Sequence, residues 1–62
     1  MVIKSVVSLG ESILKENKNI ENPLKEARLI LAESLHESKE YIIGFSEKEL
    51  TTEEFDDYFK LI

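Results

Sequence analysis

The chain has 62 residues, no cysteine and one histidine, so it forms one domain at most, without disulfides and without a metal or redox centre built on cysteine. Its formal net charge of −5 argues against nucleic-acid binding, which requires a basic stripe for the phosphates. No apolar run approaches the ~20 residues of a membrane span, and no signal-peptide pattern opens the chain. We therefore expect a cytoplasmic monomer that binds neither nucleic acid nor membrane.

Residues 2–17 form the first predicted helix, because apolar residues recur there at helical spacing with polar residues between them. The apolar positions are Val2, Ile3, Val6, Val7, Leu9, Ile13 and Leu14. Gly10 costs about 1 kcal/mol relative to alanine inside a helix, and we interpret it as a point of close helix–helix approach rather than a ligand site. Asn17 and Asn19 favour a helix end, and Ile20 is expected to fill the corner before the next helix.

The second predicted helix, over residues 23–35, has the clearest start. Asn22 suits the N-cap, and Pro23 suits the first helical position because the backbone N–H that it lacks would have no partner there. The apolar residues of this helix are Leu24, Ala27, Leu29, Ile30, Leu31 and Leu35. This stripe is wider than a surface helix needs, so we expect a central position with other helices around it. His36 is predicted to end the helix in a left-handed conformation.

A short third helix is predicted over residues 39–45, with Ser38 as its N-cap. Tyr41, Ile42 and Phe45 are expected to face inward. We interpret the two aromatic residues as core filling rather than as a binding patch.

The fourth predicted helix, over residues 52–62, opens with the sharpest local signal in the chain. Thr51 and Glu54 have the spacing of a capping box, and Leu50 and Phe55 have that of a hydrophobic staple. The apolar stripe continues through Phe55, Tyr58, Phe59 and Ile62. Because the stripe is still unfinished at the last residue, we expect the natural domain to continue beyond it.

Four helices without a strand predict an all-α fold. The expected architecture is a single domain over residues 1–62, a small orthogonal bundle of four helices, or a five-helix domain truncated at its C-terminus.

The last quarter of the chain is acidic, with two lysines against six acids: Glu47, Glu49, Glu53, Glu54, Asp56 and Asp57. Neighbouring acids in a first helical turn point apart and toward water, which does not suit a glycosidase-type carboxylate pair. The chain also lacks a Gly-rich phosphate loop, a nucleophile elbow and a metal motif. We therefore predict that these residues alone are not an enzyme and hold no catalytic, cofactor or metal site.

The order of these signals resembles the N-terminal domain of the release-factor glutamine methyltransferases, the HemK-type family. The resemblance rests on Ile20-Glu21-Asn22-Pro23, Glu26-Ala27-Arg28-Leu29-Ile30-Leu31-Ala32, Ser38-Lys39-Glu40-Tyr41-Ile42-Ile43 and Glu49-Leu50-Thr51. It extends from about Ile20 to Phe55 and more loosely over the first helix. The sequence departs from the family pattern where His36 replaces a usual glycine, Arg28 a usual acid and Thr52 a common proline.

The resemblance implies a parent enzyme that uses S-adenosylmethionine to methylate the glutamine of the Gly-Gly-Gln motif in peptide chain release factors. The family's cofactor loop and its Asn-Pro-Pro-Tyr substrate motif lie in a later Rossmann-like domain. Neither motif occurs in this sequence, so no catalytic or cofactor residue carries over. The resemblance further implies two partners for this domain, the release factor and the parent's own catalytic domain.

We predict the polar side of the second and third helices as the partner-binding face. Its residues are Lys25, Arg28, Lys39 and Glu40. The alternative is a free-standing acidic helical adaptor, without a linked enzyme, that docks a basic partner through its last helix.

Overall fold

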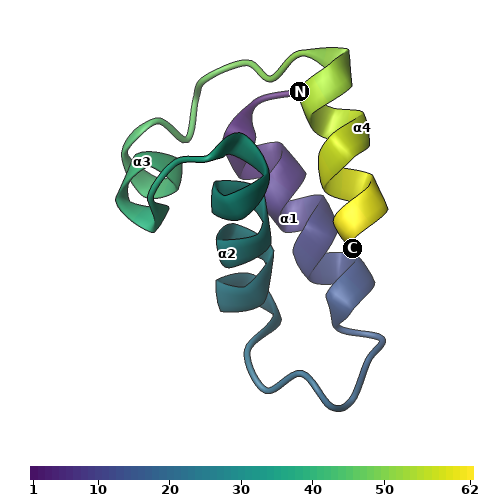
Figure 1. Cartoon of the computed structure of the whole chain (residues 1–62). Helices are drawn as coiled ribbons and strands as arrows, with labels where there is room; N and C mark the ends of the chain where they lie inside the picture. The colour runs from purple at the N-terminus through teal and green to yellow at the C-terminus, as the bar shows by residue number, and fades with distance from the viewer.

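The second helix lies at the centre of the fold. A computed structural model describes all 62 residues and contains four helices and no sheet, which confirms the all-α prediction (Figure 1). The helices are α1 (Ile3–Leu14), α2 (Pro23–Leu35), α3 (Lys39–Gly44) and α4 (Thr52–Leu61). As expected from its wide apolar stripe, α2 packs against each of the other three. None of the four helices has the length and apolarity needed to cross a membrane.

The core forms between one side of α1 and the inner faces of α2, α3 and α4. Its buried hydrophobic residues are Ile3, Val6, Val7, Leu14, Ala27, Leu31, Ala32, Ile42, Leu50 and Tyr58. Ile20 packs at its edge, as expected for a corner residue. Leu9 and Ile13, which the pattern grouped with the apolar side of the first helix, are exposed. Helix α1 is covered along one side only, so Leu9 and Ile13 remain at the surface.

Helix α1 is shorter than the predicted range of residues 2–17. It ends at Leu14, and the backbone then tightens, with the N–H of Glu16 donating to Ile13 and that of Asn17 donating to Leu14. These bonds span three residues instead of four, the pattern of a 3₁₀-type turn at a helix end.

The predicted caps of α2 and α3 are both present. The Asn22 side-chain oxygen accepts a hydrogen bond from the backbone N–H of Lys25 at 3.1 Å. The Ser38 hydroxyl accepts one from the N–H of Tyr41, also at 3.1 Å. Each cap satisfies a backbone donor that has no partner within its own helix.

His36 ends α2 in the left-handed conformation, with φ 57° and ψ 39°, and it is the only residue of the chain with positive φ. This backbone turn lets the N–H of Glu37 donate to the carbonyl of Ala32 at 2.9 Å. The bond satisfies one of the carbonyls left free at the helix end. The prediction for His36 is confirmed.

Replacing His36 with glycine is expected to raise the stability of the domain by about 0.5–1 kcal/mol, because glycine adopts positive φ without the clash of a Cβ atom. Thermal unfolding followed by circular dichroism measures the change. The control is His36→Ala, which removes the ring but keeps the Cβ. Equal stabilisation by both substitutions would assign the effect to the imidazole rather than to the backbone.

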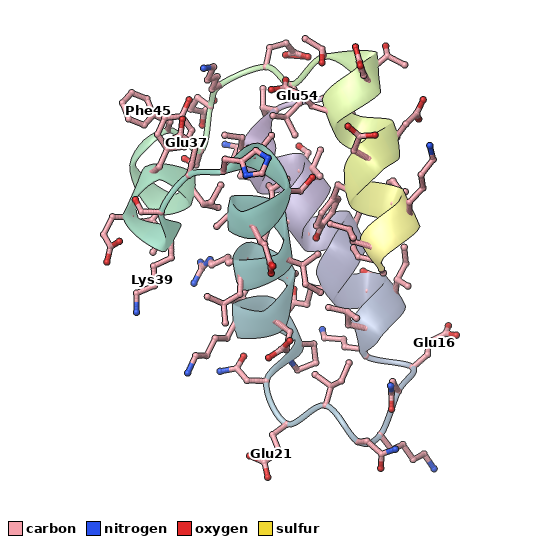
Figure 2. All side chains as sticks on the ribbon, viewed as in Figure 1. Glu16, Glu21, Glu37, Lys39, Phe45 and Glu54 are labelled. Atoms are coloured by element: carbon pink, nitrogen blue, oxygen red, sulfur yellow. The ribbon has the colours of Figure 1, made fainter.

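Phe45 corrects the expectation of an inward aromatic pair on the third helix. Ile42 is buried and Tyr41 is half-buried, but Phe45 is 55% exposed. Helix α3 ends at Gly44, and Phe45 has non-helical angles, so its side chain leaves the inner face. Its ring stacks on that of Tyr41 with the ring centres 4.6 Å apart, and Figure 2 shows it pointing away from the core.

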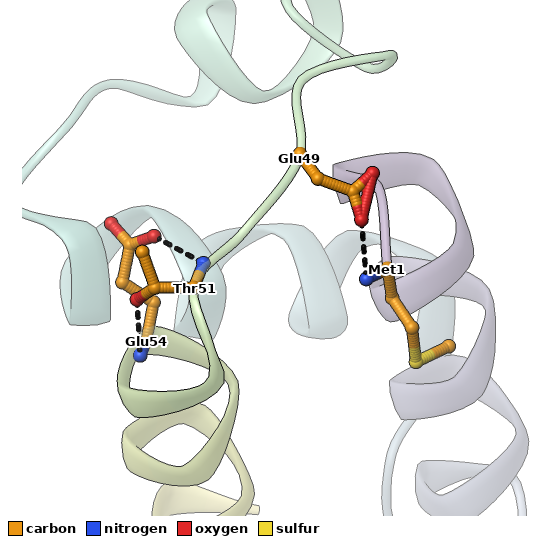
Figure 3. Close-up of polar contacts among 4 residues, drawn as sticks. All are labelled: Met1, Glu49, Thr51 and Glu54. Carbon is orange, nitrogen blue, oxygen red and sulfur yellow. Dashed lines mark hydrogen bonds and ion pairs between the residues drawn. The ribbon is translucent and has the colours of Figure 1, made fainter.

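The start of α1 has no side-chain cap, and a distant loop takes that role. The backbone N–H groups of Ile3 and Lys4 donate to the carbonyls of Lys48 and Ser46, both at 2.9 Å. The Met1 ammonium group also contacts the Glu49 carboxylate at 2.8 Å (Figure 3). Hydrogen bonds and an ion pair therefore hold the loop between α3 and α4 against the start of the chain.

The predicted capping box opens α4. The Thr51 hydroxyl accepts from the N–H of Glu54 at 3.1 Å, and the Glu54 carboxylate accepts from the N–H of Thr51 at 2.9 Å (Figure 3). Leu50 is buried and Phe55 packs against the core. The box fixes where α4 begins, and the two apolar residues hold that end of the helix on the core.

Tyr58 joins α4 to α1 and α2 in the centre of the core. Its side chain is fully buried, and its hydroxyl donates to the carbonyl of Ala27 at 3.2 Å. Gly10 makes room for it, because a Cβ atom on Gly10 would overlap the hydroxyl oxygen. This confirms the interpretation of Gly10 as a point of close helix approach.

Burial raises the pKa of Tyr58 to about 12, whereas a tyrosine in an unfolded chain titrates near 10. The stabilising effect of the neutral phenol is therefore complete below pH ~10 and is lost as the pH rises from about 10 through about 12. We expect Tyr58→Phe to lose less stability over this interval. Urea unfolding of both proteins near pH ~9 and ~11 tests this, and an equal decline in both would contradict it.

Candidate functional site

A groove on the surface between α2 and α3 brings together three of the four residues predicted for the partner-binding face. We call it the α2–α3 groove, and its volume is about 310 Å³. It is lined by Asn22, Lys25, Arg28, Leu29, Lys39 and Ile43. Figure 2 shows Lys39 extending from α3 on the side opposite to Phe45.

The cations of the groove are free of intramolecular partners. Lys25, Arg28 and Lys39 make no ion pair within 4.0 Å and no side-chain hydrogen bond. No acidic residue is among the six that line the groove. The groove therefore concentrates positive charge on a chain whose net charge is −5.

Helical spacing explains why the cations converge. Lys25 and Arg28 lie three residues apart on α2, so their side chains emerge from neighbouring positions of one face. Lys39 is the first residue of α3 and approaches the groove from the other side. Arg28 is half-buried, and its guanidinium group makes no ion pair within the chain.

Two exposed apolar side chains, Leu29 and Ile43, belong to the groove and were not predicted as functional residues. They are 39% and 56% exposed. A signal for each exists in the sequence. Leu29 lies outside the row formed by Ala27 and Leu31, which is the buried side of its helix. Ile43 directly follows Ile42, and because neighbouring residues of a helix point in different directions, a short helix buries only one of the two.

Glu40, the fourth predicted residue, does not line the groove. It is exposed in the first turn of α3. An acid at this place interacts favourably with the positive end of the helix dipole, which gives Glu40 a local role within its own helix.

A second hollow of about 420 Å³ adjoins the groove and shares Arg28 and Ile43 with it. It lies between α1, α2 and α3, with Ile3 and Val7 among its lining residues, and it also contains Glu11. Arg28 and Ile43 therefore lie between the two hollows.

The acidic last quarter is partly occupied by contacts within the chain. Glu47 pairs with Lys4 at 2.6 Å, Glu49 pairs with the terminal ammonium group, and Glu54 belongs to the capping box. The acids without such contacts are Glu53, Asp56 and Asp57. No group of three or more His, Cys, Asp or Glu side chains is placed to hold a metal ion.

The fold and this surface define the chain as a small all-α domain with an open groove that is lined by three cations. The chain belongs to the family described as the PrmC N-terminal domain, whose model matches residues 5–62. This match confirms the family resemblance and extends it over the first helix. No curated protein and no solved structure matches the chain.

Proposed function

We propose that this chain is the release-factor-binding domain of a protein-(glutamine-N5) methyltransferase that acts on the Gly-Gly-Gln motif. Family membership supports this role, since PrmC proteins are methyltransferases and this family is their N-terminal domain. The observation that carries the proposal is the α2–α3 groove, with its three unpaired cations around two exposed apolar side chains. Exposed apolar residues beside arginine are typical of surfaces that bind another protein.

The domain would act by positioning rather than by chemistry. A release factor held against its helices has its target glutamine oriented toward the parent's catalytic domain, the second proposed partner. Holding two reactants in productive geometry removes entropy from the barrier of the chemical step. S-adenosylmethionine would supply the methyl group in that other domain, because these 62 residues contain neither the cofactor loop nor the Asn-Pro-Pro-Tyr motif.

Arg28→Glu is expected to weaken binding to the release-factor domain that carries Gly-Gly-Gln by roughly tenfold, because it replaces a half-buried cation of the groove with an anion. Calorimetric titration measures the affinity, and circular dichroism checks that the fold is retained. Lys18→Glu is the matched control, since it changes the charge equally at an exposed loop position outside the groove.

Two other results of this titration are informative. If Arg28→Glu and the unsubstituted chain bind the release factor with equal affinity, the groove is not part of the interface. A loss of affinity on Asp56→Lys with Asp57→Lys, instead of on Arg28→Glu, would place release-factor binding on the acidic last helix, the docking face of the adaptor alternative, rather than on the groove.

A further inference from the structure

We propose that the α2–α3 groove recognises a protein segment that presents carboxylates around one apolar side chain. The inference rests on the proposed function only for the identity of the protein that carries this segment, the release factor. It adds to that function the chemistry of the partner's surface, namely which of its side chains contact the cations of the groove and which contact the apolar residues.

Charge complementarity is the first argument for an acidic occupant. All three titratable residues lining the groove are cations, namely Lys25, Arg28 and Lys39, and none has an internal counter-ion. The rest of the chain is strongly acidic and would repel an acidic partner elsewhere. Three of the eight Lys and Arg residues line this groove without an acid among them, so charge complementarity favours docking of an acidic segment there and helps to fix its orientation.

The arrangement of the apolar residues is the second argument. Leu29 lies one helical turn after Lys25 on α2, and Ile43 lies one turn after Lys39 on α3, so each apolar residue shares a face with a lysine. Both apolar side chains and both lysines line the same groove. An occupant that matches it places an apolar side chain on Leu29 and Ile43 and carboxylates toward the cations.

The exposure of the polar groups favours a protein segment over a small anion. Lys25 and Lys39 are exposed, Arg28 is only half-buried, and the structure has no buried polar side chain without a partner. Small-molecule sites instead enclose most of the ligand and aim buried polar groups at it. An open, charged groove with apolar side chains suits a ligand that remains partly in solvent.

Two synthetic peptides of equal length test the chemistry of the groove by itself, one repeating Glu-Leu-Glu and the other repeating Gln-Leu-Gln. Heteronuclear NMR of the isotope-labelled chain should show shifts at the groove residues with the Glu peptide. These shifts should disappear at high salt, which screens exposed charges, and should be absent with the Gln peptide. Equal shifts with both peptides, or no groove shifts with the Glu peptide, would overturn the proposal.

Titration with the release factor separates this inference from the proposed function. Arg28→Glu with Lys39→Glu should lower affinity by at least about tenfold relative to the charge-matched pair Lys18→Glu with Lys60→Glu. Ile43→Ser should also weaken binding more than Leu61→Ser, since Leu61 is equally exposed, at 57%, but lies outside the groove.

The outcomes distinguish the two claims. If the release factor binds strongly and its affinity changes neither with the groove substitutions nor with salt, the groove chemistry is overturned and the proposed function is retained. Groove shifts with the Glu peptide but no binding of the release factor support the groove chemistry and overturn the proposed partner.

Discussion

Gly10→Ala is expected to destabilise the domain by about 2 kcal/mol. The new Cβ would overlap the Tyr58 hydroxyl and lie 3.0 Å from both the Tyr58 Cζ and the Ile62 Cδ1 atoms. An overlap this deep with a fully buried side chain should cost about 3 kcal/mol, the upper end of the usual range for overpacking, and the better helix propensity of alanine offsets about 1 kcal/mol of it. Because a core of this size supplies roughly 3–5 kcal/mol, the variant should lose about half of its stability.

Gly44→Ala provides the matched control for this prediction. Gly44 is the second of the two glycines and lies at the end of α3. A Cβ atom there would meet no atom within 4 Å. The control should therefore be neutral or slightly stabilising. Urea unfolding followed by circular dichroism compares the two variants, and a Gly10→Ala protein as stable as the control would contradict close packing of α1 on α4.

The partner of Gly10 is identified by a double substitution. Tyr58→Phe removes the oxygen atom that the new Cβ would overlap. Gly10→Ala should therefore lower the free energy of unfolding by less in the Tyr58→Phe protein than in the unsubstituted chain. The same cost in both backgrounds would place the clash elsewhere.

Leu31→Ala is expected to leave most molecules unfolded at room temperature. Leu31 is fully buried on α2, at the centre of the core. Replacing a buried leucine with alanine costs ~2–5 kcal/mol from lost burial and from the cavity left behind. For a fully buried leucine we expect the upper part of this range, which is as large as the roughly 3–5 kcal/mol expected for the whole domain. The helical circular dichroism signal should fall toward that of an unfolded chain.

Leu29→Ala is the matched control, with the same chemical change two residues earlier on the same helix. Leu29 is 39% exposed, so the loss should be below about 1 kcal/mol. The control should instead weaken binding to the release factor, because Leu29 lines the α2–α3 groove. Similar unfolding midpoints for the two variants would mean that α2 does not bury the face seen in the structure.

The sequence alone determined the features that depend on neighbours along the chain. The caps at Asn22 and Ser38, the capping box at Thr51 and the left-handed end at His36 were all predicted and are all present. Each consists of a side chain or backbone conformation acting within four residues of itself, so a short stretch of sequence contains the whole interaction. The family was recognisable for the same reason, because it follows from the order of these signals.

The candidate site was predicted in part. The cations Lys25, Arg28 and Lys39 were chosen from the sequence because they lie on the polar side of the second and third predicted helices, and the structure places all three in one groove. The apolar members Leu29 and Ile43 were missed, because apolar residues on helices are normally assigned to the core. Whether such a residue is buried depends on which neighbour covers it.

The tertiary structure alone decided which apolar rows are covered and how α1 begins. Leu9, Ile13 and Phe45 carry the same hydrophobic signal as the buried residues, but they lie outside the core and are exposed. The first turn of α1 has no cap of its own and receives carbonyl groups from residues more than forty positions away. Contacts of this kind depend on where distant segments meet in space, which periodicity along a single helix does not specify.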